Sequence, residues 1–341
     1  MKKSFFINGG AGRVLCSIPA LEYYKENVDS DVIIVSEAWN ELFLTSPSLR
    51  HNVWPANSKG LWEKLRETEI ISTEPYRLNA YFNQRANLIQ AFDMIINNLS
   101  EIPETKTINL EINKVDQIYG HNLVTQVKQQ THKKKVVVFQ PLGSGAKQEG
   151  NFIYDDSGRS FEIRDIFRIV EELSKHYAVI LMTNIQIPTD KQMGAVIPNG
   201  TNLLQWMGII NASDYFLGCD SMGQHYAHAL KKPATVVIGS TYPENISYPD
   251  NKNFNIIDLG KNKRKYMPFR VTHDFALERD NEDLMIFDDT IFKEIIKSVT
   301  DRLGIESNTE TKPLSTPMLT SNQTTSFPFP VTGKTKSKKT I

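Results

Sequence analysis

Short apolar runs alternate with amphipathic segments in the first third of the chain. The pattern predicts strands at 5–7 and 31–36, with a glycine-rich turn at 9–12 and a helix at 14–26 between them. Strands that alternate with helices in this way favour a parallel sheet. Residues 61–98 are mostly helical or irregular in pattern and include the polar, aromatic-rich segment 74–84.

A second series of the same kind starts at residue 135. The pattern predicts strands at 135–140, 177–182, 214–217 and 234–238, helices at 161–176, 202–210 and 287–303, and a glycine-bearing loop at 141–160. Apolar residues at helical spacing mark the first of these helices, namely Phe161, Ile166, Ile169, Val170 and Leu173. The two series predict an α/β protein with two Rossmann-like domains, 1–125 and 135–304, facing a central cleft. The polar, basic segment 122–134 would lead from one to the other.

The C-terminal segment 305–341 loses this periodicity. It is rich in Ser, Thr and Pro and ends in a cluster of lysines, from Lys334 to Lys339. Such a composition predicts a disordered basic tail. Its lysines could contact a polyanion, although a solvated tail is the simpler interpretation.

Bulk composition narrows the function classes. The chain of 341 residues has 39 lysines and arginines and 39 aspartates and glutamates. Its net charge therefore does not attract it to nucleic acid or membranes. A local basic patch would still be compatible with a DNA partner. The two cysteines, Cys16 and Cys219, are far apart and predict small buried thiols in a reducing compartment. Since neither a signal segment nor a membrane span is recognisable, we expect a cytoplasmic protein. Neither an Asp-x-Asp motif nor a histidine cluster calls for a metal.

The turn at 218–225 (Gly-Cys-Asp-Ser-Met-Gly-Gln-His) carries the strongest chemical signal. It joins a strand to a helix, and another strand follows. In a parallel sheet such a turn lies at the carboxyl edge, where ligands bind. Free backbone N–H groups and a helix N-terminus can hold a diphosphate. The turn therefore predicts a phosphate-bearing ligand, a nucleotide above all.

The first glycine turn allows a second interpretation. Gly10-Ala11-Gly12 resembles the start of a dinucleotide fingerprint, and Glu37 closes the second strand where a ribose-binding acid would stand. The third glycine of that fingerprint is replaced by Leu15, so a nicotinamide or flavin enzyme is the third-ranked hypothesis.

Three segments together resemble glycosyltransferase family nine, the ADP-heptose:lipopolysaccharide heptosyltransferases. They are the turn and helix at 9–21, the strand and loop at 139–147 with Arg159-Ser160-Phe161 beyond, and the segment 212–230 followed by 233–241. They occur in the family's order and span roughly residues 5 to 300. The resemblance implies the GT-B fold, with the donor bound mainly by the second domain. It also implies transfer of a sugar from a nucleotide diphosphate sugar to an acceptor hydroxyl, by an inverting displacement that needs neither a metal nor a cofactor.

The resemblance assigns donor-binding residues to the second domain. They are Gly143, Ser144, Gly145, Lys147, Arg159, Asp220, Ser221, Met222, Gly223, Gln224 and Thr241. Lys147 and Arg159 would oppose the charge that grows on the leaving diphosphate; solvated loop cations are the alternative. Asp220 would brace the loop or contact the donor. The family's glycine follows the Asp-Ser pair directly, whereas here Met222 intervenes before Gly223, which predicts a different backbone path.

The catalytic base departs from the family. The family's Asp after the first turn, taken as the general base, is replaced by Arg13, whose guanidinium cannot accept a proton. Arg13 could instead bind an acceptor anion or steady the diphosphate. Glu37 is the first candidate base, Glu74 the next, and His225 the third. The alternatives are a helix-start residue for Glu37 and a packed helix histidine, or an organiser of the phosphate loop, for His225.

The acceptor side is predicted in the first domain. Its candidate residues are Gly10, Gly12, Tyr76, Arg77 and Arg85, with Tyr81, Asn83 and Gln84 nearby. Aromatic and arginine side chains suit sugars or nucleobases and their phosphates, although the aromatics could equally pack in the core. Lipopolysaccharide or another glycan is the acceptor that the resemblance implies. Arg13 and the Asn/Lys/Ile-rich composition also resemble glycosyltransferase-like proteins of tailed phages, for which a modified DNA base is an acceptor. A catalytically inactive nucleotide-sugar or glycan binder is the main alternative.

Overall fold

The computed structural model describes residues 2–150, 152–155, 157–183, 185, 187, 194–265 and 281–305. They belong to one compact unit that spans Met1–Glu306. The tail predicted at 305–341 lies outside the described residues from position 306 onward, and the boundaries predicted at 125 and 135 stay a prediction.

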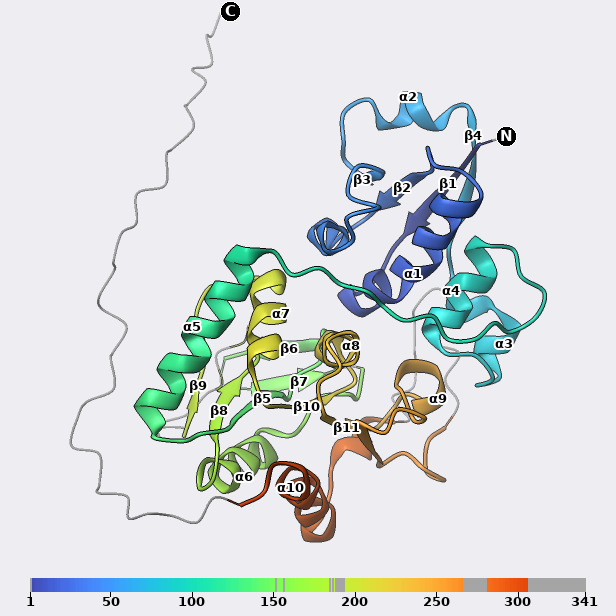
Figure 1. Ribbon diagram of the computed structural model, residues 1–341. Helices are drawn as coiled ribbons and strands as arrows, with labels where there is room; N and C mark the ends of the chain where they lie inside the picture. The colour runs from blue at the N-terminus through green and yellow to red at the C-terminus, as the bar shows by residue number, and fades with distance from the viewer. Residues whose placement is uncertain are drawn as a thin grey trace, which may run out of the picture. The chain divides into compact units, whose positions relative to one another are not determined.

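The N-terminal sheet has four parallel strands in the order β3-β2-β1-β4 (Figure 1). The strands are β1 (Lys2–Ile7), β2 (Ile33–Ser36), β3 (Val53–Pro55) and β4 (Thr68–Ser72). The helices of this part are α1 (Ala11–Asn27), η1 (Asn40–Thr45), α2 (Leu61–Leu65), η2 (Pro75–Arg77), α3 (Asn79–Phe82) and α4 (Leu88–Ile96). The two strands predicted here are confirmed. The short strands β3 and β4 were missed because their few residues form no clear alternation.

The C-terminal sheet has six parallel strands in the order β12-β11-β10-β5-β8-β9. They are β5 (Val136–Gln140), β8 (Ala178–Leu181), β9 (Ala195–Val196), β10 (Tyr215–Cys219), β11 (Ala234–Ile238) and β12 (Phe254–Asp258). The helices are α5 (Lys114–Thr131), α6 (Ile163–Ser174), α7 (Leu203–Ala212), α8 (Met222–Ala229), α9 (Pro243–Ile246), η3 (Glu282–Met285) and α10 (Asp289–Leu303). The α/β class with parallel sheets is therefore confirmed. The predicted loop 141–160 contains an antiparallel hairpin, β6 (Ala146–Glu149) and β7 (Phe152–Asp155).

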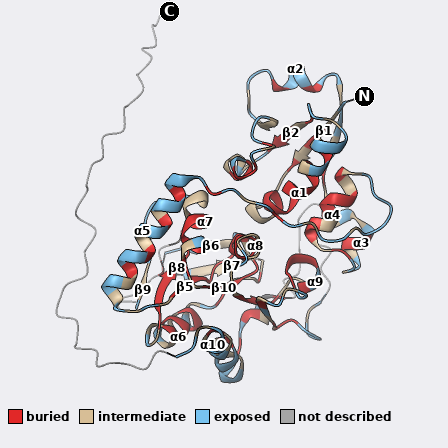
Figure 2. Cartoon of the chain, viewed as in Figure 1, coloured by how far each residue is buried: buried red, intermediate tan, exposed pale blue. Residues whose placement is uncertain are grey.

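Alternation along β5 separates the two layers of helices. Val136 and Val138 belong to the apolar cluster that includes α7 and α8, whereas Val137 and Phe139 belong to the cluster that includes α6 and α10. Successive side chains of a strand point to opposite faces, so a sheet covered on both faces reads as a continuous apolar run. Figure 2 shows the result, with buried residues along the central strands and exposed ones on the outer sides of α5 and α10.

Helix α5 occupies most of the segment that the sequence suggested as a polar lead into the second domain. Its buried positions are sparse but fall at helical spacing, at Asp116, Gly120, Val124 and Val127. It packs directly on α7, where a Cβ at Gly120 would lie 2.2 Å from the backbone of Gly208. Glycine at both positions lets the two backbones touch. The helix was not predicted because most of its residues are polar and form its exposed outer face.

Three features join the N-terminal and C-terminal sheets within the compact unit. Helix α1 packs on α8, and η1 packs on α7. In addition, the buried Asn245 on α9 donates both amide hydrogens, to the carbonyl oxygens of Tyr81 at 3.0 Å and Ala86 at 2.8 Å. One apolar cluster also runs from β1 and α1 to α7 and α8. These contacts place the carboxyl ends of β1 and β2 next to those of β5 and β10.

Candidate active site

A cavity of about 320 Å³ is lined by residues from both sheets. The N-terminal part contributes Gly10, Ala11, Gly12, Arg13, Trp39, Tyr76 and Leu88. The C-terminal part contributes Gln140, Leu142, Gly143, Ser144, Ala146, Arg159, Met182, Thr183, Ile185, Leu203, Trp206, Asp220, Ser221, Met222, His225 and Ile246. Most of these residues follow strands or begin helices, as expected at the carboxyl edge of a parallel sheet.

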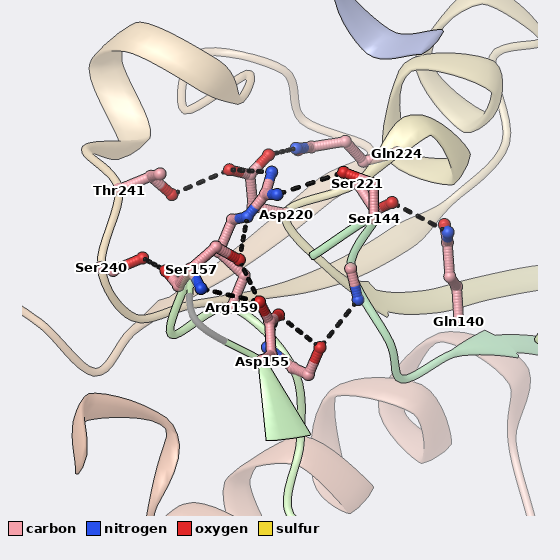
Figure 3. Close-up of polar contacts among 12 residues, drawn as sticks. Gln140, Ser144, Asp155, Ser157, Arg159, Asp220, Ser221, Gln224, Ser240 and Thr241 are labelled. Carbon is pink, nitrogen blue, oxygen red and sulfur yellow. Dashed lines mark hydrogen bonds and ion pairs between the residues drawn. The ribbon is translucent and has the colours of Figure 1, made fainter. Parts of the chain in front are cut away.

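Asp155 organises the polar end of this cavity (Figure 3). Its Oδ1 accepts hydrogen bonds from the Ser157 amide at 2.8 Å and hydroxyl at 2.5 Å. Its Oδ2 accepts from the Ser160 hydroxyl at 2.6 Å and amide at 3.1 Å. Ser160 Oγ in turn accepts from the Gly143 amide at 2.9 Å. One carboxylate at the end of β7 therefore fixes the loop 157–160 and the glycine loop after β5.

Arg159 projects from that loop toward the turn after β10 (Figure 3). Its Nε donates to Ser157 Oγ at 2.8 Å and its Nη2 to Ser144 Oγ at 3.2 Å, while Nη1 lies 3.8 Å from Asp220 Oδ2. Burial by itself would lower the pKa of Arg159, but Asp220 and Asp155 together hold that pKa above its ordinary value. The cavity thus has a fixed, permanently charged cation on its wall.

Asp220 is the carboxylate that faces this cation. Its Oδ1 accepts from Gln224 Nε2 at 2.8 Å and its Oδ2 from Thr241 Oγ1 at 3.0 Å. Burial raises the pKa of Asp220, and the positive charge of Arg159 opposes that rise. Gln224 and Thr241 do not line the cavity themselves, but both donate hydrogen bonds to Asp220, which does. Both of these groups are side chains, so Asp220 connects α8 to the loop after β11, and its contact with a sugar donor stays a prediction.

The glycine that is shifted by one position has a steric reason. Gln140 at the end of β5 donates to Ser221 Oγ at 2.9 Å and accepts from the Gly223 amide at 2.9 Å. A Cβ at position 223 would lie 2.3 Å from Gln140 Oε1. The close approach to β5 therefore requires glycine at 223, and Met222 takes the adjacent place on the cavity wall.

Arg13 lies 4% exposed at the start of α1 and is held by several groups of the N-terminal sheet. Its Nη1 donates to Glu74 Oε1 at 3.2 Å, and its Nη2 donates to Asn8 Oδ1 at 2.7 Å and to the Thr73 carbonyl at 3.1 Å. The guanidinium also lies 4.8 Å from the ring centroid of Tyr76. Arg13 touches the cavity, but these contacts tie the ends of β1 and β4 together.

His225 lies directly under the first glycine turn. Its Nδ1 is 2.7 Å from the Tyr248 hydroxyl and 3.6 Å from Cys16 Sγ, and a Cβ at Gly12 would meet its ring at 2.9 Å. Burial, with a smaller contribution from His228, lowers the pKa of His225 to about 3. The imidazole is therefore neutral at pH 7 and a weak base.

The other predicted site residues lie outside the cavity lining. Glu37 is exposed after β2, and Lys147 is exposed on β6, 5.8 Å from the ring centroid of Tyr154. Arg77 is exposed on η2, and the exposed Arg85 donates to Asn79 Oδ1 at 2.6 Å. Gly145 lies behind the glycine loop, where a Cβ would be 2.4 Å from Asp155 Oδ1. The structure thus brings Gly10, Gly12, Arg13 and Tyr76 together with Gly143, Ser144, Arg159, Asp220, Ser221, Met222 and His225, and leaves these five aside.

Sequence reasoning missed two groups of residues here. One is the apolar wall, with Trp39, Trp206, Met182, Ile185 and Leu203. The other is the support for Arg159, namely Asp155, Ser157 and Ser160. The short Asp-x-Ser-x-Arg-Ser run at 155–160 was a usable signal, because acceptors so close to an arginine are suited to fixing it.

Solved structures supply the comparison, since neither a family model nor a curated protein matches the sequence. ADP-heptose lipopolysaccharide heptosyltransferase II from E. coli superposes with a TM-score of 0.58, at 13% identity over 88% of this chain and 99% of that one. A family 9 glycosyl transferase from Veillonella parvula gives 0.59, at 11% identity over 88% and 96%. The iron-containing dodecameric glycosyltransferase TibC from enterotoxigenic E. coli gives 0.55, at 11% over 88% and 77%.

The chain has the GT-B fold. The match runs through both sheets, because it covers 88% of the chain. The fold predicted from the resemblance is therefore confirmed. Among the described residues, none of the helices is long and apolar enough to cross a membrane, and no group of three potential His, Cys, Asp or Glu ligands comes together.

Proposed function

We propose that this protein is a glycosyltransferase that moves a sugar from a nucleotide diphosphate sugar to an acceptor hydroxyl. The observation that carries the proposal is the fixed Arg159, held by Ser157, Ser144 and Asp220 on the wall of a cavity lined by both sheets. A buried, pre-positioned guanidinium is suited to a diphosphate, because it opposes charge that increases as the leaving group departs. The GT-B fold of the structural neighbours supports the same assignment.

The proposed reaction is a single displacement with inversion. The acceptor oxygen attacks the anomeric carbon, the bond from that carbon to the diphosphate oxygen breaks, and its electron pair stays on the diphosphate. Arg159 and the amide of Ser144 stabilise that charge, so the proposal needs no metal or organic cofactor. The acceptor is a glycan of the lipopolysaccharide type, or a modified DNA base if the protein is phage-encoded.

The proton of the acceptor hydroxyl needs a base. We keep Glu37 as the first candidate, because it stands two residues before the cavity residue Trp39 and its carboxylate is exposed. Arg13 cannot accept a proton and would steady the turn that faces the acceptor. His225, neutral and bonded to Tyr248, would support the diphosphate turn. Glu37→Gln is expected to lower transfer at least about 100-fold with nucleotide binding retained.

A binding screen tests the proposal before any acceptor is known. Thermal shifts are measured with ADP-, UDP-, GDP- and CDP-sugars, in EDTA and with NADH as the comparison. We expect one nucleotide class to raise Tm of the wild type and to lose that effect in Arg159→Ala. A shift with NADH and none with any nucleotide sugar would overturn the proposal in favour of an oxidoreductase.

One observation favours a second function, that of a binder without transfer. The cavity-lining carboxylate Asp220 is engaged by Gln224 and Thr241 and faces Arg159, while Glu74 is paired with Arg13. Nucleoside diphosphate binding without release of product on a panel of glycan and DNA acceptors would assign this role.

A further inference from the structure

Trp39 has an unusual backbone conformation for a large side chain. It has φ 61° and ψ 33°, the left-handed region, and stands at the start of η1. The other non-glycine residues with positive φ in the described part of the chain are Gln84, Asn98, His132, Lys231 and Asn262. All of these are polar, and asparagine in particular tolerates this region. Trp39 is thus the one large apolar residue of that set.

The loop around Trp39 holds this conformation in place. The Glu37 amide donates to the Ile7 carbonyl at 3.1 Å, and Ser36 Oγ donates to the Ala38 carbonyl at 2.6 Å. The Leu42 amide then donates to the Trp39 carbonyl at 3.0 Å. Glycine would adopt the same backbone without strain. Strained residues that are fixed by their surroundings in this way cluster at ligand sites. The indole of Trp39 is therefore a candidate ligand contact.

The indole is only partly covered. Trp39 is 38% exposed although it lines the cavity. The helix η1, which follows Trp39, packs on α7, whose Leu203 and Trp206 also line the cavity. Because the conformation is strained and the side chain is left uncovered, core packing does not explain a tryptophan at this position.

We propose that Trp39 is a stacking platform for a sugar ring of the acceptor. This inference rests on the proposed function. The groups suited to the diphosphate, Ser144 and Arg159, both come from the C-terminal part of the site, whereas Trp39 follows β2 of the N-terminal sheet. Indole stacks on the apolar C–H face of a pyranose while its edges leave the hydroxyl groups free to hydrogen-bond. Trp39 therefore selects acceptors that present such a face.

The test uses three variants of the full chain, Trp39→Gly, Trp39→Tyr and the control Trp62→Ala, whose tryptophan is 60% exposed on α2 and away from the cavity. Tryptophan emission is titrated with methyl β-D-galactopyranoside and, separately, with UDP and ADP. We expect a saturable change with the galactoside in the wild type and in Trp62→Ala. Calorimetry measures the affinity of Trp39→Gly for the galactoside, which should be at least about tenfold weaker than that of the wild type. The affinity of Trp39→Tyr should stay within about threefold of wild type. Tm should be unchanged or higher in Trp39→Gly, because glycine relieves the strain.

Other results would overturn the inference. A lower Tm in Trp39→Gly with unchanged galactoside affinity would indicate a packing role. If the wild type gives no response to the galactoside, Trp39 does not bind a sugar ring. If binding of UDP or ADP weakens tenfold in Trp39→Gly, Trp39 contacts a nucleobase and not the acceptor sugar. The proposed function fails separately, when no nucleotide sugar shifts Tm of the wild type. A galactoside response that depends on Trp39 would uphold sugar stacking even then.

Discussion

The two glycine turns after the first strands of the two sheets have similar sequences and different surroundings. The turn at Gly9–Gly12 packs against His225, and its Arg13 is bonded to Glu74, Asn8 and Thr73. The turn at Gly143–Gly145 is fixed from behind by Ser160 and Asp155, and the nearby Arg159 faces the cavity. An arginine lies near each turn, and both arginines line the cavity. Arg13 also joins the ends of β1 and β4, whereas Arg159 reaches the second turn from the loop 157–160.

This contrast teaches that a glycine turn at the carboxyl edge of a sheet is not by itself a phosphate site. What differs is how closely protein groups engage the local cation and pack on the turn. Arg13 donates to Glu74 at 3.2 Å and His225 packs under Gly12, whereas Nη1 of Arg159 lies 3.8 Å from the carboxylate of Asp220. The following predictions test that difference, from the largest expected effect to the smallest.

Arg13→Met should destabilise the fold by about 3–5 kcal/mol, because it leaves Glu74 with a partly buried, unpaired charge. Urea denaturation measures the free energy of unfolding. The matched control is Lys2→Met, which removes the exposed pair with Asp31 and should cost less than about 1 kcal/mol. Nucleoside diphosphate affinity should stay within about threefold in the folded variant. A stable Arg13→Met that no longer binds the nucleotide would reverse the roles of the two arginines.

Arg159→Ala should weaken binding of UDP or ADP, whichever the wild type binds, by about 100-fold, because a charge-assisted contact is lost and Asp220 loses its cation. Isothermal calorimetry measures Kd. Lys147→Ala is the control, since that lysine is exposed on β6 outside the cavity lining, and we expect a change below about threefold. Equal losses in both variants would show that general positive charge, and not the fixed geometry, holds the ligand.

Gly12→Ala should lower stability by about 1–3 kcal/mol, because the new methyl would lie 2.9 Å from the His225 ring. Gly10→Ala is the matched control. Its backbone is extended and the nearest contact of a Cβ is Ser144 Oγ at 4.0 Å, so the change should be below about 1 kcal/mol. Thermal and urea unfolding of the pair give the comparison. Equal effects at both positions would contradict the packing of this turn on α8.

Stability should fall on mild acidification because of two histidines of α8, His225 and His228. The folded pKa of His225 is lowered to about 3 and that of His228 to about 4, both by burial. The unfolded chain therefore takes up protons below about pH 6.5 that the folded chain does not, and stability is lost as pH decreases. Between pH 6 and pH 5 we expect a loss of about 1 kcal/mol for His225. His225→Gln should flatten that slope and the exposed His121→Gln should not; identical slopes in both would refute the assignment.

Part of the site was predictable from the sequence alone. Asp220 and Gly223 were identified because they stand in a turn that directly follows a short apolar run, whereas Gly143 and Arg159 were assigned through the resemblance to glycosyltransferase family nine. Glu74 and Tyr248 were not identified as the partners of Arg13 and His225. Each lies far along the chain from its partner, and only the packing of strands and helices brings it near. Trp39 gave no signal because a single tryptophan in a polar loop has no periodicity.

The sequence by itself determined the two α/β halves, the parallel sheets and the turns at their carboxyl edges. These follow from alternation over a few residues and from glycines at strand ends, which are local properties. The tertiary structure brought both glycine turns to one cavity, decided which protein groups pack on each, and placed Trp39 and Arg159 on the walls of that cavity. Those outcomes depend on how α1 meets α8 and how η1 meets α7, which are contacts between residues widely separated in the chain. The pattern of polar and apolar residues does not encode such distances directly.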